Sequence, residues 1–254
     1  MGHPDHGHIA TSSPVGVLVV GPAPAETVVR AWAARGIRIL HDQPAASPCL
    51  VCGPATPAFL TTGLNAPFAG FIERDDESEA QGLSEDALAA IRCGGRVLSI
   101  TAAAAYGADV ARIMSESIAA WLVPPQDVME RVEIALSEAV SNAVLHGNLG
   151  LDSDLRQSLA GLEQFQILLA ERMADPALSR RRLYLTAGDH DGMIQISVTD
   201  QGGGFDFARA ISAPVIPGKA SGRGLQLILR LCDNVVGHNG GRGLTMYWRQ
   251  DGNR

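Results

Sequence analysis

The stretch Glu138-Ala-Val-Ser-Asn142-Ala-Val-Leu-His146-Gly147-Asn148 decides the fold of this chain. A helix with about 3.6 residues per turn places its carboxylate, carboxamide and imidazole at i, i+4 and i+8 on one side. The neighbouring side of the same helix carries an apolar stripe made of Val132, Leu136, Ala139 and Ala143. Because that stripe requires burial, we predict a helix that holds Glu138, Asn142 and His146 half-sheltered at the margin of a core.

Two side chains of this helix suit a metal-nucleotide site. The carboxamide oxygen of Asn142 is a hard ligand of the kind that Mg²⁺ accepts. The carboxylate of Glu138 lies one turn away, where it can accept a proton from an attacking hydroxyl or water. For the helix taken alone, a solvated face with this spacing by chance is the alternative.

A glycine-rich turn, Asp200-Gln-Gly202-Gly-Gly204, follows a predicted strand. A carboxylate only accepts hydrogen bonds, and the 6-amino group of adenine donates them, so Asp200 could recognise that base. Gly202 and Gly204 have no Cβ, which lets the backbone approach a base and a ribose closely. An ordinary Asp-Gly turn is the alternative for this segment by itself.

A third segment, Gly218-Lys-Ala-Ser-Gly222-Arg-Gly224-Leu225, runs from a loop into a predicted helix. The unpaired N–H groups and the dipole at a helix N-terminus favour phosphate. Lys219 and Arg223 could add positive charge near a β- or γ-phosphate. By itself a G-x-G is a weak signal.

Together and in this order, the three segments resemble the N, G1 and G2 boxes of the GHKL ATPase superfamily. The resemblance covers roughly residues 96–254 and is closest to the anti-sigma-factor serine kinases. Their ATPase domain likewise opens with a strand, a long helix and a proline-marked break, here Pro124-Pro125. The resemblance implies a two-layer α/β sandwich of helices on a mixed sheet, with ATP bound between the layers.

The resemblance also implies residue roles. Asn142 would ligate Mg²⁺ and Glu138 would act as general base, whereas His146 receives no catalytic role. The adenine would be read by Asp200, with Gly202 and Gly204 beside it. The lid over the phosphates would consist of Gly222, Arg223 and Gly224, and Lys219 would add charge there.

The first ninety-odd residues alternate between strand-like and helix-like segments, which indicates a small doubly wound α/β domain. The predicted strands are Val15–Val20, Ile37–His41, Pro48–Cys52 and Pro67–Ile72, and the predicted helices are Ala25–Arg35, Pro57–Gly63 and Ser84–Cys93. This pattern resembles the receiver domain of two-component signalling. Gly21-Pro22 and Cys52-Gly53 stand where a receiver needs carboxylates for Mg²⁺ and phosphate. We therefore expect a degenerate receiver used for docking or dimerisation, or an unrelated α/β adaptor.

The remaining segments complete the predicted organisation: a disordered tail (1–13), the receiver-like domain (14–94) and the ATPase domain (95–254). Within the last, residues 149–181 form an insertion that could serve as a lid or partner element. Its predicted strands are Arg96–Ile100, Arg182–Thr186, Met193–Thr199 and Gly243–Trp248. Its other predicted helical segments are Ala104–Trp121, a helix capped by Asp127, the amphipathic stretch Leu149–Asp175, and Leu225–Leu231. A hairpin turn is predicted at Gly188–Gly192.

The amino-acid composition limits the kinds of partner that the protein is expected to bind. The 254 residues include 27 acidic and 20 basic side chains, a formal net charge of −7 without a basic run, so nucleic acid is a poor candidate partner. No apolar run approaches the roughly 20 residues of a membrane span, and no signal peptide precedes the domain, which indicates a cytoplasmic protein. The four cysteines, including the Cys49-x-x-Cys52 pair, favour buried hydrophobes over a zinc site.

From these features we expect an ATP- and Mg²⁺-dependent serine/threonine protein kinase of the anti-sigma-factor type. Its protein substrate would be an anti-sigma antagonist, it could also sequester a sigma factor, and the resemblance suggests a homodimer. One alternative is an ATP-binding switch that sequesters a partner and transfers nothing. Another is the catalytic domain of a histidine kinase, but no upstream helical hairpin with a phosphoacceptor histidine is visible.

Overall fold

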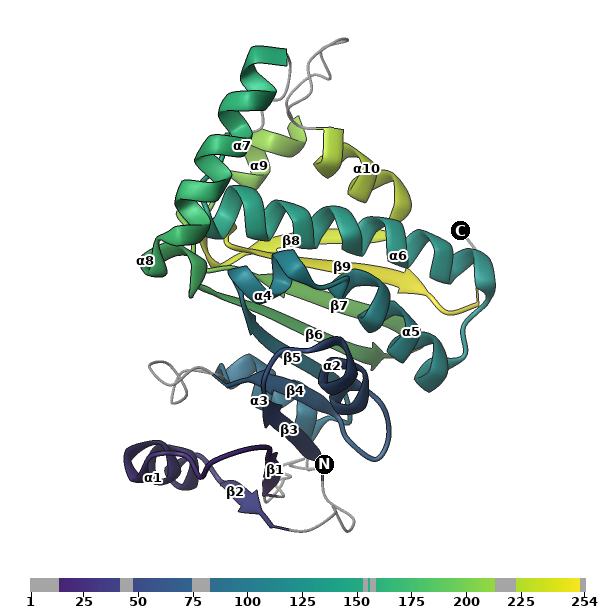
Figure 1. Cartoon of the computed structure of the whole chain (residues 1–254). Helices are drawn as coiled ribbons and strands as arrows, with labels where there is room; N and C mark the ends of the chain where they lie inside the picture. Colours follow the sequence, from purple (N-terminus) through teal and green to yellow (C-terminus); the bar gives the residue numbers. More distant parts are fainter. Residues whose placement is uncertain are drawn as a thin grey trace, which may run out of the picture.

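The described residues form a nine-stranded sheet with the strand order β2-β1-β3-β4-β5-β6-β7-β9-β8. The computed structural model describes residues 14–41, 48–74, 83–152, 155, 159–212 and 223–251. The early strands lie at one end of the sheet and the late strands at the other, so the sheet follows the chain from purple to yellow (Figure 1). The fold is mixed α/β, as the sequence predicts.

The strands are β1 (Val15–Val19), β2 (Ile37–Leu40), β3 (Cys49–Gly53), β4 (Gly70–Glu73), β5 (Arg96–Thr101), β6 (Arg182–His190), β7 (Met193–Thr199), β8 (Asn234–His238) and β9 (Gly243–Arg249). The α-helices are α1 (Glu26–Ala34), α2 (Pro57–Leu64), α3 (Glu85–Arg92), α4 (Ala102–Gly107), α5 (Val110–Leu122), α6 (Gln126–Ser141), α7 (Leu159–Ala174), α8 (Pro176–Ser179), α9 (Phe207–Ser212) and α10 (Arg223–Leu231). A π-helix, η2 (Asn142–Asn148), continues α6, and a short 3₁₀ turn, η4 (Asn239–Gly241), precedes β9.

The N-terminal half is a parallel sheet, in which β1 pairs with β2 and β3, and β3 with β4. Every residue of β3 is buried, because helices cover both faces of the sheet. Cys49 and Cys52 therefore lie in two different hydrophobic clusters, on opposite faces of this strand. Both side chains are buried, in agreement with the interpretation of this pair as small buried hydrophobes.

Strand β5 joins the two halves of the sheet. It pairs in parallel with β4 on one side and antiparallel with β6 on the other. The buried side chain of Arg182 strengthens this junction, since its guanidinium donates to the carbonyl oxygens of Glu73 and Ser99, at 3.0 and 3.4 Å. The strand predicted to open the ATPase segment is thus also the last strand of the parallel half.

The C-terminal half is antiparallel, with β6 paired to β7, β7 to β9 and β9 to β8. Strand β7 shows the alternation of a half-buried strand, with Ile194, Ile196 and Val198 buried. Helices α5, α6 and α10 cover one side of these strands (Figure 1). The predicted apolar stripe of α6 is confirmed, because all four of its residues lie in this core.

Two predicted helix boundaries are wrong. The single helix expected over Ala104–Trp121 is broken at Ala108, whose extended backbone separates α4 from α5. The carboxylate of Asp109 accepts a hydrogen bond from the Arg112 N–H and so caps α5. Helix α6 begins after Pro125 without a side-chain cap, and Asp127 lies in its first turn instead of capping it.

In the C-terminal half, the sequence predicts one hairpin turn correctly but misses one strand. The hairpin turn at Gly188–Gly192 is confirmed, with β6 ending at His190 and β7 starting at Met193. Strand β8, by contrast, has no counterpart among the predicted strands. In the segment expected to be helical, α7 begins at Leu159, while residues 153–154 and 156–158 lie outside the described part.

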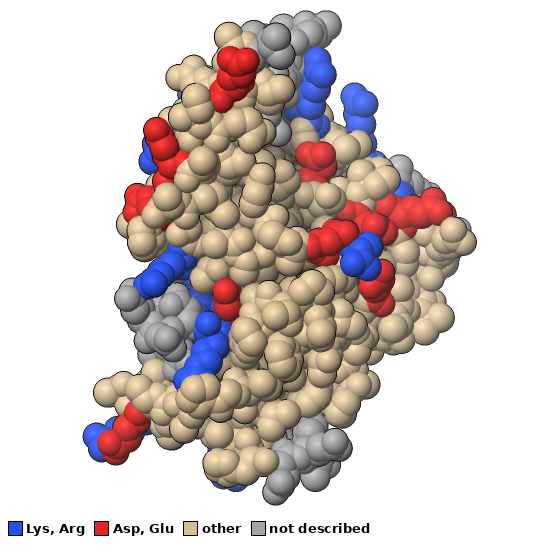
Figure 2. All heavy atoms as spheres, viewed as in Figure 1, with Lys and Arg blue, Asp and Glu red and all other residues tan. Residues whose placement is uncertain are grey.

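On the face shown in Figure 2, Lys and Arg side chains are scattered among Asp and Glu side chains. Acidic side chains gather there over α5 and α6, where Glu116 and Asp109 both pair with Arg112. Among the described helices, none combines the length and apolar character needed to span a bilayer.

Candidate active site

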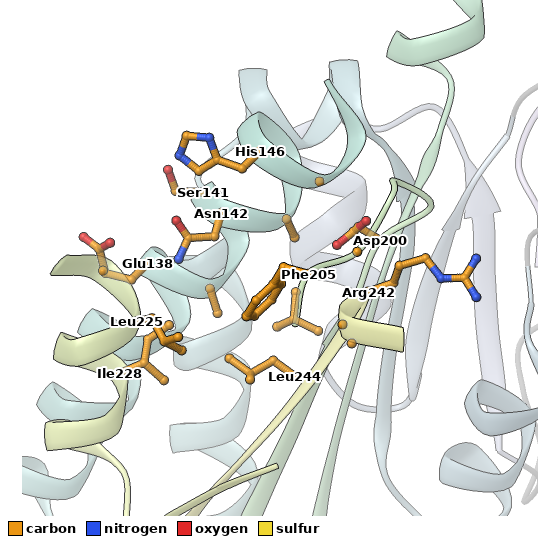
Figure 3. Close-up of a pocket in the computed structure, with 18 of the residues that line it drawn as sticks. Glu138, Ser141, Asn142, His146, Asp200, Phe205, Leu225, Ile228, Arg242 and Leu244 are labelled. Atoms are coloured by element: carbon orange, nitrogen blue, oxygen red, sulfur yellow. The ribbon is translucent and has the colours of Figure 1, made fainter. Parts of the chain in front are cut away.

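A pocket of about 880 Å³ opens between α6 and its π-helical extension, the turn after β7, the first turn of α10 and the start of β9. Figure 3 shows the polar side chains along the helix on one side and Asp200 on the other. The polar residues of the lining include Glu138, Asn142, His146, Asp200 and Arg223. Three segments that are far apart in sequence thus meet around one cavity.

The helix that carries the first motif changes its winding inside the motif. From Asn142 to Asn148 the backbone is π-helical, and the N–H of Leu149 donates to the Val144 carbonyl, five residues back. Such a wide turn is a frequent feature of functional sites. Although an α-helical period was predicted throughout, Glu138, Asn142 and His146 still all line the pocket. The Nδ1 atom of His146 contacts the Leu151 carbonyl at 2.5 Å, which holds the ring at the pocket edge.

Asp200 follows β7 directly and points into the pocket (Figure 3). Its N–H donates to the Arg242 carbonyl at 2.9 Å, and its Oδ1 accepts a hydrogen bond from the Gly202 N–H at 2.7 Å. Burial raises the pKa of this carboxyl above its ordinary value of 3.8, because the charged form loses hydration. The Gly202 N–H and the charges of Arg242 and Arg181 oppose that rise.

The glycines of the turn allow close contacts between backbone segments. A Cβ on Gly147 would lie 2.5 Å from Cγ of Asp200, and one on Gly202 would lie 2.0 Å from the Gly147 carbonyl oxygen. Gly204 has φ of +74° and would meet the Gly240 carbonyl oxygen at 2.2 Å. Gly202 and Gly204 are therefore required by the protein's own packing, and Gly204 also lines the pocket.

The start of α10 closes the pocket on the side of Glu138. A Cβ on Gly224 would lie 2.6 Å from Oε2 of Glu138 and 3.3 Å from Nδ2 of Asn142. Arg223 and Gly224 both belong to the pocket lining. Two further predicted lid residues, Lys219 and Gly222, lie outside the described residues.

Several lining residues were not predicted. The apolar wall consists of Phe205, Leu225, Ile228, Leu244 and Val198. Phe205 directly follows the last glycine of its turn, and an aromatic residue in that place was the available signal. Arg181 and Arg242 also line the pocket, but their positions depend on strand pairing that the sequence does not reveal.

The donor set of the pocket fits Mg²⁺ held mainly by a ligand's phosphates. Among the described residues no cluster of three or more His, Cys, Asp or Glu side chains could hold a metal by itself. Mg²⁺ usually takes one or two protein oxygen ligands and completes its shell with water and phosphate oxygens. The Asn142 carboxamide, next to the Glu138 carboxylate, offers such an incomplete set on the pocket wall.

A helix-lined cavity over an antiparallel sheet, with a half-buried carboxylate opposite an amide and carboxylate pair, is the arrangement of a nucleotide-binding ATPase domain. A family model described as the histidine kinase-like ATPase domain matches residues 100–248, more than half of the chain. The chain therefore belongs to the histidine kinase-like ATPase family, the GHKL type, and binds ATP through this domain. A search of curated proteins found no match.

Proposed function

We propose that this protein is an ATP- and Mg²⁺-dependent serine/threonine kinase of the anti-sigma-factor type. Its substrate is proposed to be an anti-sigma antagonist protein, and sequestration of a sigma factor a second role. The observation that carries the proposal is the convergence of Glu138, Asn142 and Asp200 on one pocket. A site for nucleotide binding alone has no use for a carboxylate beside the metal-binding amide.

In this proposal each side of the pocket holds one part of ATP. Asp200 accepts a hydrogen bond from the adenine amino group, and the base lies against the apolar wall of Leu244 and Ile228. Asn142 holds the Mg²⁺, with Arg223 adding positive charge at the phosphate end. A Mg²⁺ ion held there by Asn142 would supply positive charge that neutralises the phosphates during transfer.

The chemical step follows from the position of Glu138. The hydroxyl oxygen of a substrate serine attacks the γ-phosphorus, and the bond to the bridging oxygen of the β-phosphate breaks. ADP leaves, and the hydroxyl proton passes to the Glu138 carboxylate. Because Glu138 lies against the first turn of α10, the position of that helix sets the position of the base.

Two features of the N-terminal half of the protein favour a role in docking. In the described part of this half, helices α1, α2 and α3 contain no histidine, which argues against a histidine-kinase arrangement with an upstream phosphoacceptor. Gly21-Pro22 follow β1 and Cys52-Gly53 end β3, so the places where a receiver needs carboxylates carry none. We propose that this half positions a partner protein or a second copy of the chain.

The test is phosphoryl transfer from labelled ATP to candidate antagonist proteins in the presence of Mg²⁺. The wild-type protein should label a serine of the partner, and Glu138→Gln should lower that rate by about 10²- to 10⁴-fold while ATP binding persists. Glu133→Gln is the matched control, since Glu133 is an exposed residue of the same helix outside the pocket lining. Binding of ATP without transfer by the wild type would favour a sequestering switch and overturn the kinase.

A further inference from the structure

Asn148, the residue after the glycine of the first motif, is completely buried between the pocket and the sheet. Both polar atoms of its carboxamide form hydrogen bonds. Oδ1 accepts a hydrogen bond from the Gln201 N–H at 2.8 Å, and Nδ2 donates to the Arg182 carbonyl at 3.2 Å. Gln201 is the neighbour of Asp200 in the chain, so one side chain links the end of the helix to the turn that carries the carboxylate.

The contacts around Asn148 leave the turn little freedom. The side-chain oxygen of Gln201 accepts a hydrogen bond from the Arg182 N–H at 2.6 Å, which connects the same turn to β6 a second time. The Asn148 carbonyl accepts a hydrogen bond from Nη1 of Arg181 at 2.9 Å. Because Arg181 lines the pocket, the group is continuous with the site.

The direction of the Asp200 side chain follows from this arrangement. On one side its N–H is bound to the Arg242 carbonyl, and on the other the next peptide N–H is bound to Asn148. The glycine at 147 lets the Asp200 carboxylate pack directly on the helix backbone. Loss of the Asn148 carboxamide would free the peptide after Asp200 while leaving the carboxylate itself in place.

We propose that Asn148 is a positioning residue for base recognition, which aims the Asp200 carboxylate through the Gln201 peptide. This inference rests on the adenine-reading role proposed for Asp200. Asn148 does not touch the nucleotide. Asn148 should therefore affect only the preference between two kinds of base. One kind donates a hydrogen bond from its 6-position, and the other accepts a hydrogen bond there.

The experiment compares dissociation constants for ATP and inosine triphosphate, measured by calorimetry on the full chain. Inosine carries an oxygen in place of the 6-amino group and cannot donate to Asp200. Wild-type protein should prefer ATP by about 10- to 150-fold, the ratio that corresponds to one hydrogen bond to a charged group. Asn148→Ala should weaken ATP binding towards the inosine triphosphate value, leaving the latter nearly unchanged.

Two further variants separate positioning from general destabilisation. Ser117→Ala removes another buried polar contact, the hydrogen bond from the Ser117 hydroxyl to the Leu64 carbonyl on α2, away from the pocket. It should leave the ratio of the two dissociation constants unchanged. Gln201→Ala removes the side-chain contact with the Arg182 N–H but keeps the Gln201 N–H that Asn148 binds, so it should leave the ratio closer to the wild-type value than Asn148→Ala does.

Equal weakening of both nucleotides in Asn148→Ala, or an unchanged ratio in this variant, would overturn the positioning role. If Asn148→Ala does not fold, Asn148→Ser takes its place with the same two outcomes, because its shorter side chain keeps a polar group but does not reach the Gln201 N–H as the carboxamide does. A wild-type protein that binds the two nucleotides equally would overturn both this inference and the proposed role of Asp200. Absence of phosphoryl transfer, by contrast, bears only on the kinase proposal.

Discussion

A Cβ atom on Gly224 would lie 2.6 Å from Oε2 of Glu138, so α10 approaches the proposed base as closely as a glycine allows. Glu138 lies on α6 and Gly224 on α10, and the hairpin of β6 and β7 stands between these two helices in the sequence. Their contact fixes the distance between the helix that carries the base and the helix that begins at the phosphate end of the pocket.

Gly224→Ala should therefore displace the Glu138 carboxylate and impair transfer more than binding. A contact below 3 Å forces either the helix or the Glu138 side chain to move, and small errors in the placement of a base cost roughly 10²-fold in rate. The measurement is the turnover number together with KM for ATP. Gly107→Ala, which adds a Cβ in open space, is the control and should change neither.

Gly202→Ala should abolish tight ATP binding, because its Cβ would lie 2.0 Å from the Gly147 carbonyl oxygen. The turn has to move away from the helix, and overpacking of this kind destabilises a fold by about 1–3 kcal/mol. Gly188→Ala, on β6 and outside the pocket lining, places its Cβ in open space and should bind ATP normally. Equal ATP affinities for the two variants would contradict the packing described for this turn.

The affinity for ATP should fall as the pH falls through the pKa of Asp200. Burial raises that pKa above 3.8, and only the ionised carboxylate offers both oxygens as acceptors. Dissociation constants measured from neutral pH down through this pKa should rise in the wild type about tenfold per pH unit below it. Asp200→Asn should bind more weakly and lack this inflection, since its amide does not titrate.

The same shift has the opposite sign for stability. A carboxyl whose folded-state pKa is raised is easier to bury when protonated, so its contribution favours the folded state at low pH. That contribution is lost as pH rises from 3.8 through the raised value. Urea unfolding of the wild type and Asp200→Asn over this range should show the Asn variant gaining relative stability with pH.

Arg182→Met should destabilise the protein by about 1–3 kcal/mol, because buried carbonyl oxygens lose a donor. The guanidinium of Arg182 donates to the carbonyls of Glu73 and Ser99, and the side chain is buried. Arg38→Met, at an exposed position on β2, is the control. An Arg182→Met protein with the urea midpoint of the control would show that these contacts add nothing to the free energy of unfolding.

Strong local signals made much of the fold predictable. Uninterrupted apolar runs identify the buried strands of the parallel half, and the alternation over Met193–Thr199 reproduces β7 to the residue. Strand β8 escaped because its five residues include Gly237, which packs under the Phe207 ring and weakens any strand pattern. The break at Ala108 escaped because alanine favours helix, and only the cap at Asp109 marks the interruption.

The site residues that belong to a sequence motif were predictable, whereas the features of the site that depend on packing were not. Glu138, Asn142 and Asp200 line one pocket, and their residue types already suggested polar roles. The π-helical turn from Asn142 to Asn148 has no signature in the motif, and its last residue is bound through its side chain to the Gln201 N–H, a contact between segments far apart in sequence. Arg242 enters the lining because the Asp200 N–H is bound to its carbonyl, a pairing that depends on where β9 lies.

The double pairing of β5 has a consequence for how this protein could be divided. A chain shortened to residues 95–254 would keep the ATPase motifs but leave one side of β5 without its partner β4. The uncovered edge would present the backbone of Val97 and Leu98 for pairing with other chains, and exposed apolar edges of this kind promote aggregation. The ATPase half is thus not a detachable module, because the half that precedes it covers the edge of its first strand.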